Sequence, residues 1–158
     1  MKTATISELK KELKMRNPQQ VEEFCLRLAR FKKDNKELLT YLLFEADDEE
    51  VYIRDIKVEI SNQFSALNRS NLYYTKKMLR KILRNTNKYI RYSGEKKTEV
   101  ELLIFFCKEL KHSGIPVDQS ITLTNMYQNL LRKIKKSLTT LHEDLQYDYA
   151  ADMKELTG

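Results

Sequence analysis

The sequence predicts an all-α fold, and three of its features carry that prediction. Apolar residues recur every three or four positions through most of the 158 residues, which is the spacing of one face of an α-helix. Only three Gly and two Pro interrupt the chain, so long helices go largely unbroken. Residues that make good N-caps stand before several of the apolar stretches. We therefore expect about six or seven helices, packed as stacked αα-hairpins in a helical bundle or a short α-superhelix.

Three helices are expected in the first 44 residues. Thr5 and Asn17 stand where N-caps belong, and Glu8 and Gln20 follow them at the spacing of a capping box. The helix after Asn17 carries an apolar stripe at helical spacing, which we expect to be buried. Its members are Val21, Phe24, Cys25, Leu28 and Phe31. A third helix is expected from about Asp34, with a buried face made of Leu38, Leu39, Leu42 and Leu43.

Residues 48–67 fit two patterns. The stretch from Ile56 to Ile60 alternates apolar and polar side chains as a strand does, but a longer apolar stripe and a capped start at Asp47 favour a helix. Further helices are expected over about 70–92 and 96–113. Gly94 ends the first of these, because a glycine readily adopts the left-handed conformation of a helix C-terminus.

The last helix is expected to be long, because no Gly or Pro occurs from Ser120 to Thr157. Unbroken, it would measure about 50 Å. No linker or low-complexity segment divides the chain, so residues 1–158 are expected to form one all-helical domain. The rhythm of helix, short turn and helix is similar to an α-solenoid or HEAT-type stack, an analogy of fold that implies no function.

The chain lacks the signals of membrane or secretory proteins. It has no run of about 20 apolar residues and no apolar segment of a signal peptide near its start. We expect a cytoplasmic protein without membrane insertion. Cys25 and Cys107 lie in apolar stripes, so we expect two buried, unreactive thiols, with a disulfide or a reactive site as the alternative.

Catalytic and cofactor motifs are missing from the sequence. The glycines are too scattered for a phosphate-binding loop, and His112 and His142 are isolated from Cys or Glu partners at metal-binding spacing. The acidic run 45–50 lacks the spacing of a calcium loop and is better explained as the start of a helix. We expect no enzyme, no cofactor, no metal and no catalytic residue.

One stretch carries a positive signal. From Arg69 to Tyr92 the chain has eight Lys or Arg and no Asp or Glu. On a helix with about 100° per residue, most of these cations share one sector about 100° wide. The candidate binding residues are Lys77, Arg80, Lys81, Arg84, Lys88 and Arg91, with Tyr73 at the edge of the sector.

This basic sector admits three interpretations. It is a solvated face, or one neutralised by the acidic run 45–50 or by the acidic C-terminal residues folding across it. Alternatively it binds nucleic acid, or it binds an acidic protein or an anionic surface. Since no catalytic pattern is present, we expect a non-enzymatic interaction or scaffold module with a protein partner. The alternative function is sequence-tolerant nucleic-acid binding through the helix at about 70–92.

Overall fold

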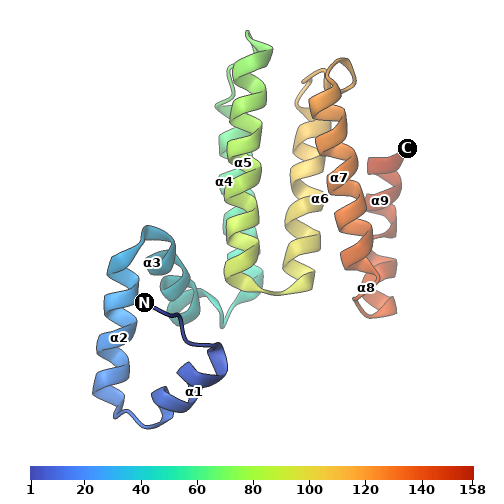
Figure 1. Ribbon diagram of the computed structural model, residues 1–158. Coiled ribbons are helices and arrows are strands. Elements are labelled where there is room, and N and C mark those ends of the chain that lie inside the picture. Colours follow the sequence, from blue (N-terminus) through green and yellow to red (C-terminus); the bar gives the residue numbers. More distant parts are fainter. The chain divides into compact units, whose positions relative to one another are not determined.

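The computed structural model describes all residues 1–158 and contains helices without strands, which confirms the all-α prediction (Figure 1). The chain divides into two compact units, Met1–Phe44 and Glu45–Gly158. The division falls within a short π-helix, Tyr41–Glu45, and no Gly, Pro or polar linker marks it. A sequence pattern does not reveal such a boundary, because the apolar spacing continues through it.

The first unit contains three short helices, α1 (Ile6–Lys14), α2 (Pro18–Phe31) and α3 (Lys33–Thr40). Both predicted capping boxes are present. The Thr5 hydroxyl accepts a hydrogen bond from the Glu8 amide at 3.3 Å, and the Asn17 side-chain oxygen Oδ1 accepts one from the Gln20 amide at 2.9 Å. The α2 and α3 helices pack against each other, and the Asn35 side-chain amide donates to the Leu28 carbonyl at 2.8 Å.

The predicted burial of the apolar stripes in this unit is wrong. None of α1, α2 and α3 has a buried residue, and Phe31 on α2 is 78% exposed. Cys25 is exposed as well, against the prediction of a buried thiol. Leu38, Leu42 and Leu43 are also exposed, and Leu39 is half-buried. Three short helices supply too few neighbours to cover apolar faces from all sides, which is the general difficulty of very small units.

The second unit is built around α6 (Lys96–His112), and its other long helices are α4 (Glu49–Ser65), α5 (Leu72–Ser93) and α7 (Ile121–Leu138). The α6 helix packs against α4, α5 and α7, and Figure 1 shows α5, α6 and α7 side by side. Its apolar residues surround the helix, as expected for one with neighbours on several sides. Its completely buried apolar residues are Val100, Leu102, Leu103, Phe106, Cys107 and Leu110.

The α4 segment is a helix and not a strand. The predicted cap at Asp47 is off by one residue, because the Asp48 carboxylate is the one that accepts a hydrogen bond from the Val51 amide, at 3.2 Å. Its apolar stripe faces the core, and Phe64 meets Phe106 of α6 edge to face with 5.3 Å between ring centroids. The longer stripe and the capped start therefore outweigh the short strand-like alternation.

The prediction of one long, continuous helix at the C-terminus is wrong. A 3-10 turn, η2 (Val117–Gln119), precedes α7, and two short helices follow it, α8 (Glu143–Asp148) and α9 (Ala150–Thr157). At the end of α7 the Thr139 and Thr140 hydroxyls donate to the carbonyls of Lys136 and Ser137, both at 2.6 Å. Hydroxyls that bond nearby carbonyls compete with helix propagation. The break lets α9 pack on α6, where Leu156 is only 3% exposed.

Candidate nucleic-acid interface

The α5 helix has sharply different faces. Asn71 caps its start by accepting a hydrogen bond from the Tyr73 amide at 2.9 Å, and Gly94 ends it with φ of 71°. Its buried residues are Thr75, Leu79, Ile82, Thr86 and Ile90. At about 100° per residue, the centre of the predicted basic sector lies about 180° from these residues. The sector therefore points directly away from the core of the second unit.

The structure brings the predicted site residues together on this outward face. Five of the six cations are exposed: Lys77, Arg80, Lys81, Arg84 and Arg91. Tyr73, at the edge of the sector, is 69% exposed. Lys88 is half-buried and interacts with another group. The other five cations form what we call the α5 basic face.

No residue of the α5 basic face takes part in an ion pair, although the molecule forms many ion pairs elsewhere. Like charges three or four positions apart on a helix repel by about 0.2–0.5 kcal/mol per pair. That repulsion is offset only by solvent and salt ions, unless a ligand supplies negative charge.

The acidic run 45–50 is used at other places. Asp48 caps α4, Glu50 pairs with Lys97 at 2.6 Å, and Glu49 accepts hydrogen bonds from the hydroxyls of Thr98 and Ser93. These contacts tie the start of α4 to the start of α6. They do not include a residue of the α5 basic face.

The acidic C-terminal residues are bound to α6. Lys108 pairs with Asp152 at 2.5 Å and with Glu155 at 3.3 Å, and His112 lies 3.4 Å from Glu155. The hydrogen bond to Asp152 raises the pKa of Lys108 above its ordinary value, because it favours the charged ammonium. These ion pairs therefore do not neutralise the α5 basic face. Neutralisation is one form of the first interpretation; the other form, a solvated face, is not affected by these ion pairs.

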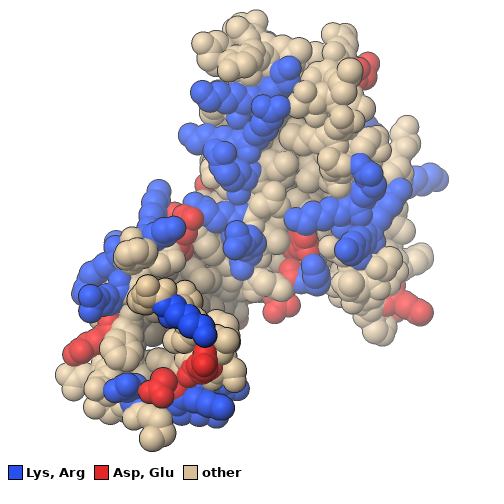
Figure 2. All heavy atoms as spheres, viewed as in Figure 1, with Lys and Arg blue, Asp and Glu red and all other residues tan.

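A second group of cations, which the sequence interpretation did not include among the site residues, lies on α7. Arg132, Lys133, Lys135 and Lys136 are all exposed. Figure 2 shows Lys and Arg gathered over α5 and again over the region of α7 on the same face of the second unit. In the sequence, the only indication of this second group was the positive charge of residues 114–136, with four Lys or Arg and one Asp. Only the fold brings these cations to the same face as α5 (Figure 2).

A groove of about 380 Å³ lies between α5 and α7, with residues of α6 in its lining. Lys133 of α7 lies 3.3 Å from the Asn87 side-chain oxygen of α5 and 3.2 Å from the Glu99 carboxylate of α6. The groove is lined by Asn87, Ile90, Arg91, Gly94, Glu95, Lys96, Glu99 and Lys133. Three of these residues are cations and two are carboxylates.

Glu99 is only 6% exposed and lies at the floor of this groove, in the first turn of α6. Burial raises the pKa of its carboxyl, but hydrogen bonds from Lys96 at 2.8 Å and from Lys133 outweigh burial and hold the pKa below its ordinary value. The carboxylate therefore stays ionised near neutral pH and is matched by two ammonium groups. It does not leave an unbalanced negative charge in the groove.

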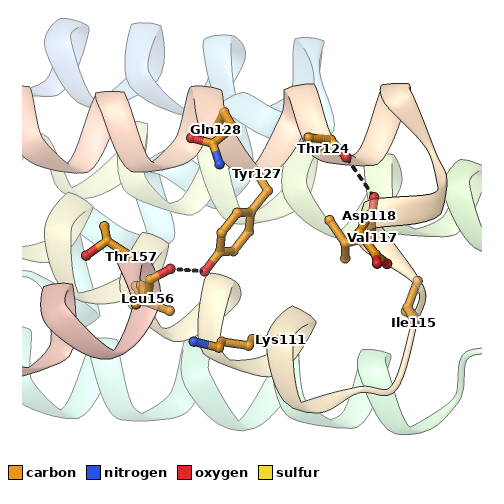
Figure 3. Close-up of a pocket in the computed structure, with 10 residues that line it drawn as sticks. Lys111, Ile115, Val117, Asp118, Thr124, Tyr127, Gln128, Leu156 and Thr157 are labelled. Atoms are coloured by element: carbon orange, nitrogen blue, oxygen red, sulfur yellow. Dashed lines mark hydrogen bonds between the residues drawn. The ribbon is translucent and has the colours of Figure 1, made fainter.

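A separate hollow of about 480 Å³ lies where the ends of α6 and α9 meet the start of α7 (Figure 3). Tyr127 reaches across it and donates a hydrogen bond to the Leu156 carbonyl at 2.8 Å. Burial raises the pKa of the Tyr127 hydroxyl above its ordinary value. The Thr124 hydroxyl donates to the Val117 carbonyl at 2.9 Å, so the hydroxyls of Tyr127 and Thr124 are both used within the fold.

The remaining titratable groups form no cluster with metal-binding geometry: no three His, Cys, Asp or Glu side chains are placed to hold an ion together. His142 caps α8, where its ring nitrogen accepts a hydrogen bond from the Asp144 amide at 3.2 Å, and His112 is the last residue of α6.

No protein-family model matches this chain, and neither a curated protein nor a solved structure resembles it significantly. None of its helices combines the length and the apolar character that a bilayer span requires. The α5 basic face and the residues around it are therefore interpreted from their own chemistry.

Proposed function

We propose that this chain is a non-enzymatic interaction module of the cytoplasm that binds nucleic acid through the α5 basic face. The observation that supports the proposal is the set of five exposed cations without a carboxylate partner. The two acidic segments available to neutralise them make their contacts elsewhere. A polyanion supplies the missing negative charge.

The dimensions of the face suit a phosphate backbone. From Lys77 to Arg91 the helix rises about 21 Å, and phosphates on one strand repeat at about 3.4 Å, so several phosphates lie within reach. Lys and Arg contacts to phosphate position a protein on nucleic acid without reading bases. Binding is therefore expected to tolerate any sequence.

The test is the salt dependence of binding, measured by fluorescence anisotropy with a labelled 20-nucleotide DNA. If five cations neutralise five phosphates, log K against log salt has a slope of about −4.5 on duplex and about −3.5 on a single strand. The triple variant Lys77→Gln, Arg80→Gln, Arg84→Gln should bind far more weakly and with a shallower slope.

A matched control removes three exposed cations from other helices: Arg54→Gln, Lys135→Gln and Lys154→Gln. Its net charge equals that of the α5 triple variant, so non-specific charge effects are the same. Equal loss of binding in the two triple variants, or no binding of the wild type at low salt, contradicts the proposal.

A second candidate function, binding of a protein partner, is favoured by the bare helices of the first unit. The α1, α2 and α3 helices leave apolar side chains such as Phe24, Leu28 and Phe31 exposed. Residues 1–44 carry ten Lys or Arg and six Asp or Glu. An amphipathic helix with acidic residues beside its apolar stripe fits both features, since burial supplies affinity and charge supplies specificity.

Cys25 on α2 is a natural reporter for this candidate, because its thiol is exposed in the free chain. Two synthetic amphipathic peptides that share the same apolar face are compared. The first has Glu on its polar face and the second has Lys. The Glu peptide should slow the modification of Cys25 by a thiol reagent, and Leu28→Asp should abolish that protection. Equal protection by both peptides, or by neither, rejects an acidic helix as the partner.

A further inference from the structure

We propose that the nucleic acid bound by this chain is single-stranded and that its path continues from α5 across the groove to α7. This inference rests on the proposed function and deepens it. It adds two features that lie beyond the α5 basic face, a pair of exposed tyrosines at one end and the α7 cations at the other.

The tyrosine pair lies at the start of α5. Tyr73 and Tyr74 are 69% and 59% exposed, and their rings meet edge to face with 5.6 Å between centroids. Asn71 accepts hydrogen bonds from both of their amides and so holds this first turn in place. Two adjacent exposed rings offer flat apolar surface to unpaired bases, which stack on aromatic side chains. The bases of a duplex are already stacked on each other and gain nothing there.

The other end of the path lies at the groove beside Arg91. Lys133 joins the α7 side of this groove to Asn87 of α5. At about 100° per residue, Lys136 lies about 60° from Lys133 around the α7 helix, whereas Lys135 lies about 160° away. Lys136 therefore extends the positive surface that begins on α5, and Lys135 points away from it.

A strand that contacts both ends has to run along α5 and then sideways to α7. Duplex DNA is stiff over roughly 150 base pairs and does not follow such a turn on the scale of one small unit. A single strand bends at every nucleotide and follows a positive surface wherever it leads. The placement of the cations on two helices thus favours a single strand over a duplex.

The first experiment compares a labelled 20-nucleotide single strand without self-complementarity with its duplex, using the full chain. The single strand should bind more tightly. The double variant Tyr73→Ala, Tyr74→Ala should weaken single-strand binding by about five-fold or more and leave duplex binding unchanged. The double Phe variant keeps both rings and should bind as the wild type does. Tyr147→Ala, which removes an exposed tyrosine from α8, is the control and should have no effect.

The second experiment compares two neighbouring lysines of α7. Lys136→Gln should make the salt slope on the single strand shallower by about 0.7, the value of one lost phosphate contact. Lys135→Gln changes the same charge on the same helix and should leave the slope unaltered.

The outcomes separate the inference from the proposed function. Equal affinity for strand and duplex with unaffected tyrosine variants overturns the single-strand inference, while binding through α5 stands. Identical slopes for the two lysine variants overturn the path to α7. Failure to bind any nucleic acid removes the proposed function itself, and equally tight binding of polyglutamate shows a polyanion surface without preference for nucleic acid.

Discussion

At the scale of single residues, the two cysteines show how a shared pattern leads to different environments. Both lie in apolar stripes at helical spacing, yet Cys107 is buried in α6 and Cys25 is exposed on α2. Burial raises the pKa of the Cys107 thiol to about 12, because the thiolate is poorly solvated there. An apolar stripe indicates which face of a helix prefers burial, and only the neighbouring elements decide whether that face is covered.

Thiol labelling of the native chain at neutral pH should therefore modify one cysteine quickly and the other very slowly. We expect one equivalent of label before unfolding and two after it, measured by mass spectrometry. Cys25→Ser should leave the native protein unlabelled, since the Cys107 thiol is both inaccessible and protonated. Rapid labelling of Cys107 in the folded variant would show that α6 is not packed as described.

Glu101 of α6 provides a prediction on the pH dependence of stability. Burial raises the pKa of its carboxyl, but hydrogen bonds from Lys57 at 2.9 Å and from the Tyr149 hydroxyl at 2.8 Å outweigh burial and hold the pKa below the ordinary value of 4.5. Because the folded pKa is depressed, the stabilisation is present above the unfolded pKa and is lost as pH falls through the folded pKa.

We therefore expect Glu101→Gln to lower the free energy of unfolding by about 1.5–3 kcal/mol at pH 7, the typical value for hydrogen bonds to a charged group. The difference between wild type and variant should shrink as pH falls below the ordinary pKa of 4.5 and through the lower folded pKa. Urea unfolding of wild type and variant at pH 7 and at acidic pH measures the difference in the free energy of unfolding. A difference that stays constant with pH would mean that the ionised carboxylate contributes nothing.

At the scale of elements, the short-range signals of the sequence were reliable. The N-caps at Thr5 and Asn17 and the end of α5 at Gly94 are where the pattern predicts them, because each depends on residues within one helical turn. Five of the six cations of the predicted α5 sector are exposed, as that spacing requires. The break between α7 and α8 was not predicted. Threonine hydroxyls that bond to nearby carbonyls compete with the helix, but the packing of α9 on α6, which accompanies the break, is a contact between distant segments.

The left-handed end of α5 can be tested by Gly94→Ala. A Cβ at this position would meet no atom within 4 Å, so the substitution tests backbone conformation alone. With φ of 71°, an alanine is expected to destabilise the second unit by about 1–2 kcal/mol, measured by urea unfolding. Gly94→Asn should cost less, because asparagine adopts this conformation more readily. An alanine variant as stable as the wild type would show that the helix ends differently.

At the scale of the whole molecule, the two units differ in how they hold themselves together. The second unit has a continuous core around α6, with Leu103 and Phe106 completely buried, and polar contacts that fasten α9 to it. The α1, α2 and α3 helices of the first unit contain no buried side chain. Regions with few buried apolar contacts open at low free-energy cost, whereas core helices open only with global unfolding.

Hydrogen exchange monitored by mass spectrometry should therefore show a graded pattern. Backbone amides of α1, α2 and α3 are expected to exchange at least ten-fold faster than those of α6, because their opening requires little loss of buried surface. Limited proteolysis should cleave the first 44 residues before it cleaves the second unit. Equal protection of α2 and α6 amides would contradict this difference in packing.

The candidate site was predictable only in part. Lys77, Arg80 and Arg84 were assigned to one outward sector from their spacing, and the structure leaves them exposed. The contact of Lys133 with Asn87 of α5 was not predictable, because the two residues lie 46 positions apart and meet only through the shared packing of α5 and α7 on α6.

By itself, the sequence determined the helical class of this protein, local features such as the N-cap at Asn17 and the end of α5 at Gly94, and the separation of leucine and lysine faces on α5. These properties arise from interactions between residues a few positions apart. The tertiary structure alone decided which apolar stripes are covered, where the acidic segments pair, and which cations meet across the groove. Those outcomes depend on contacts between distant segments, where burial of side chains and pairing of charges are settled together.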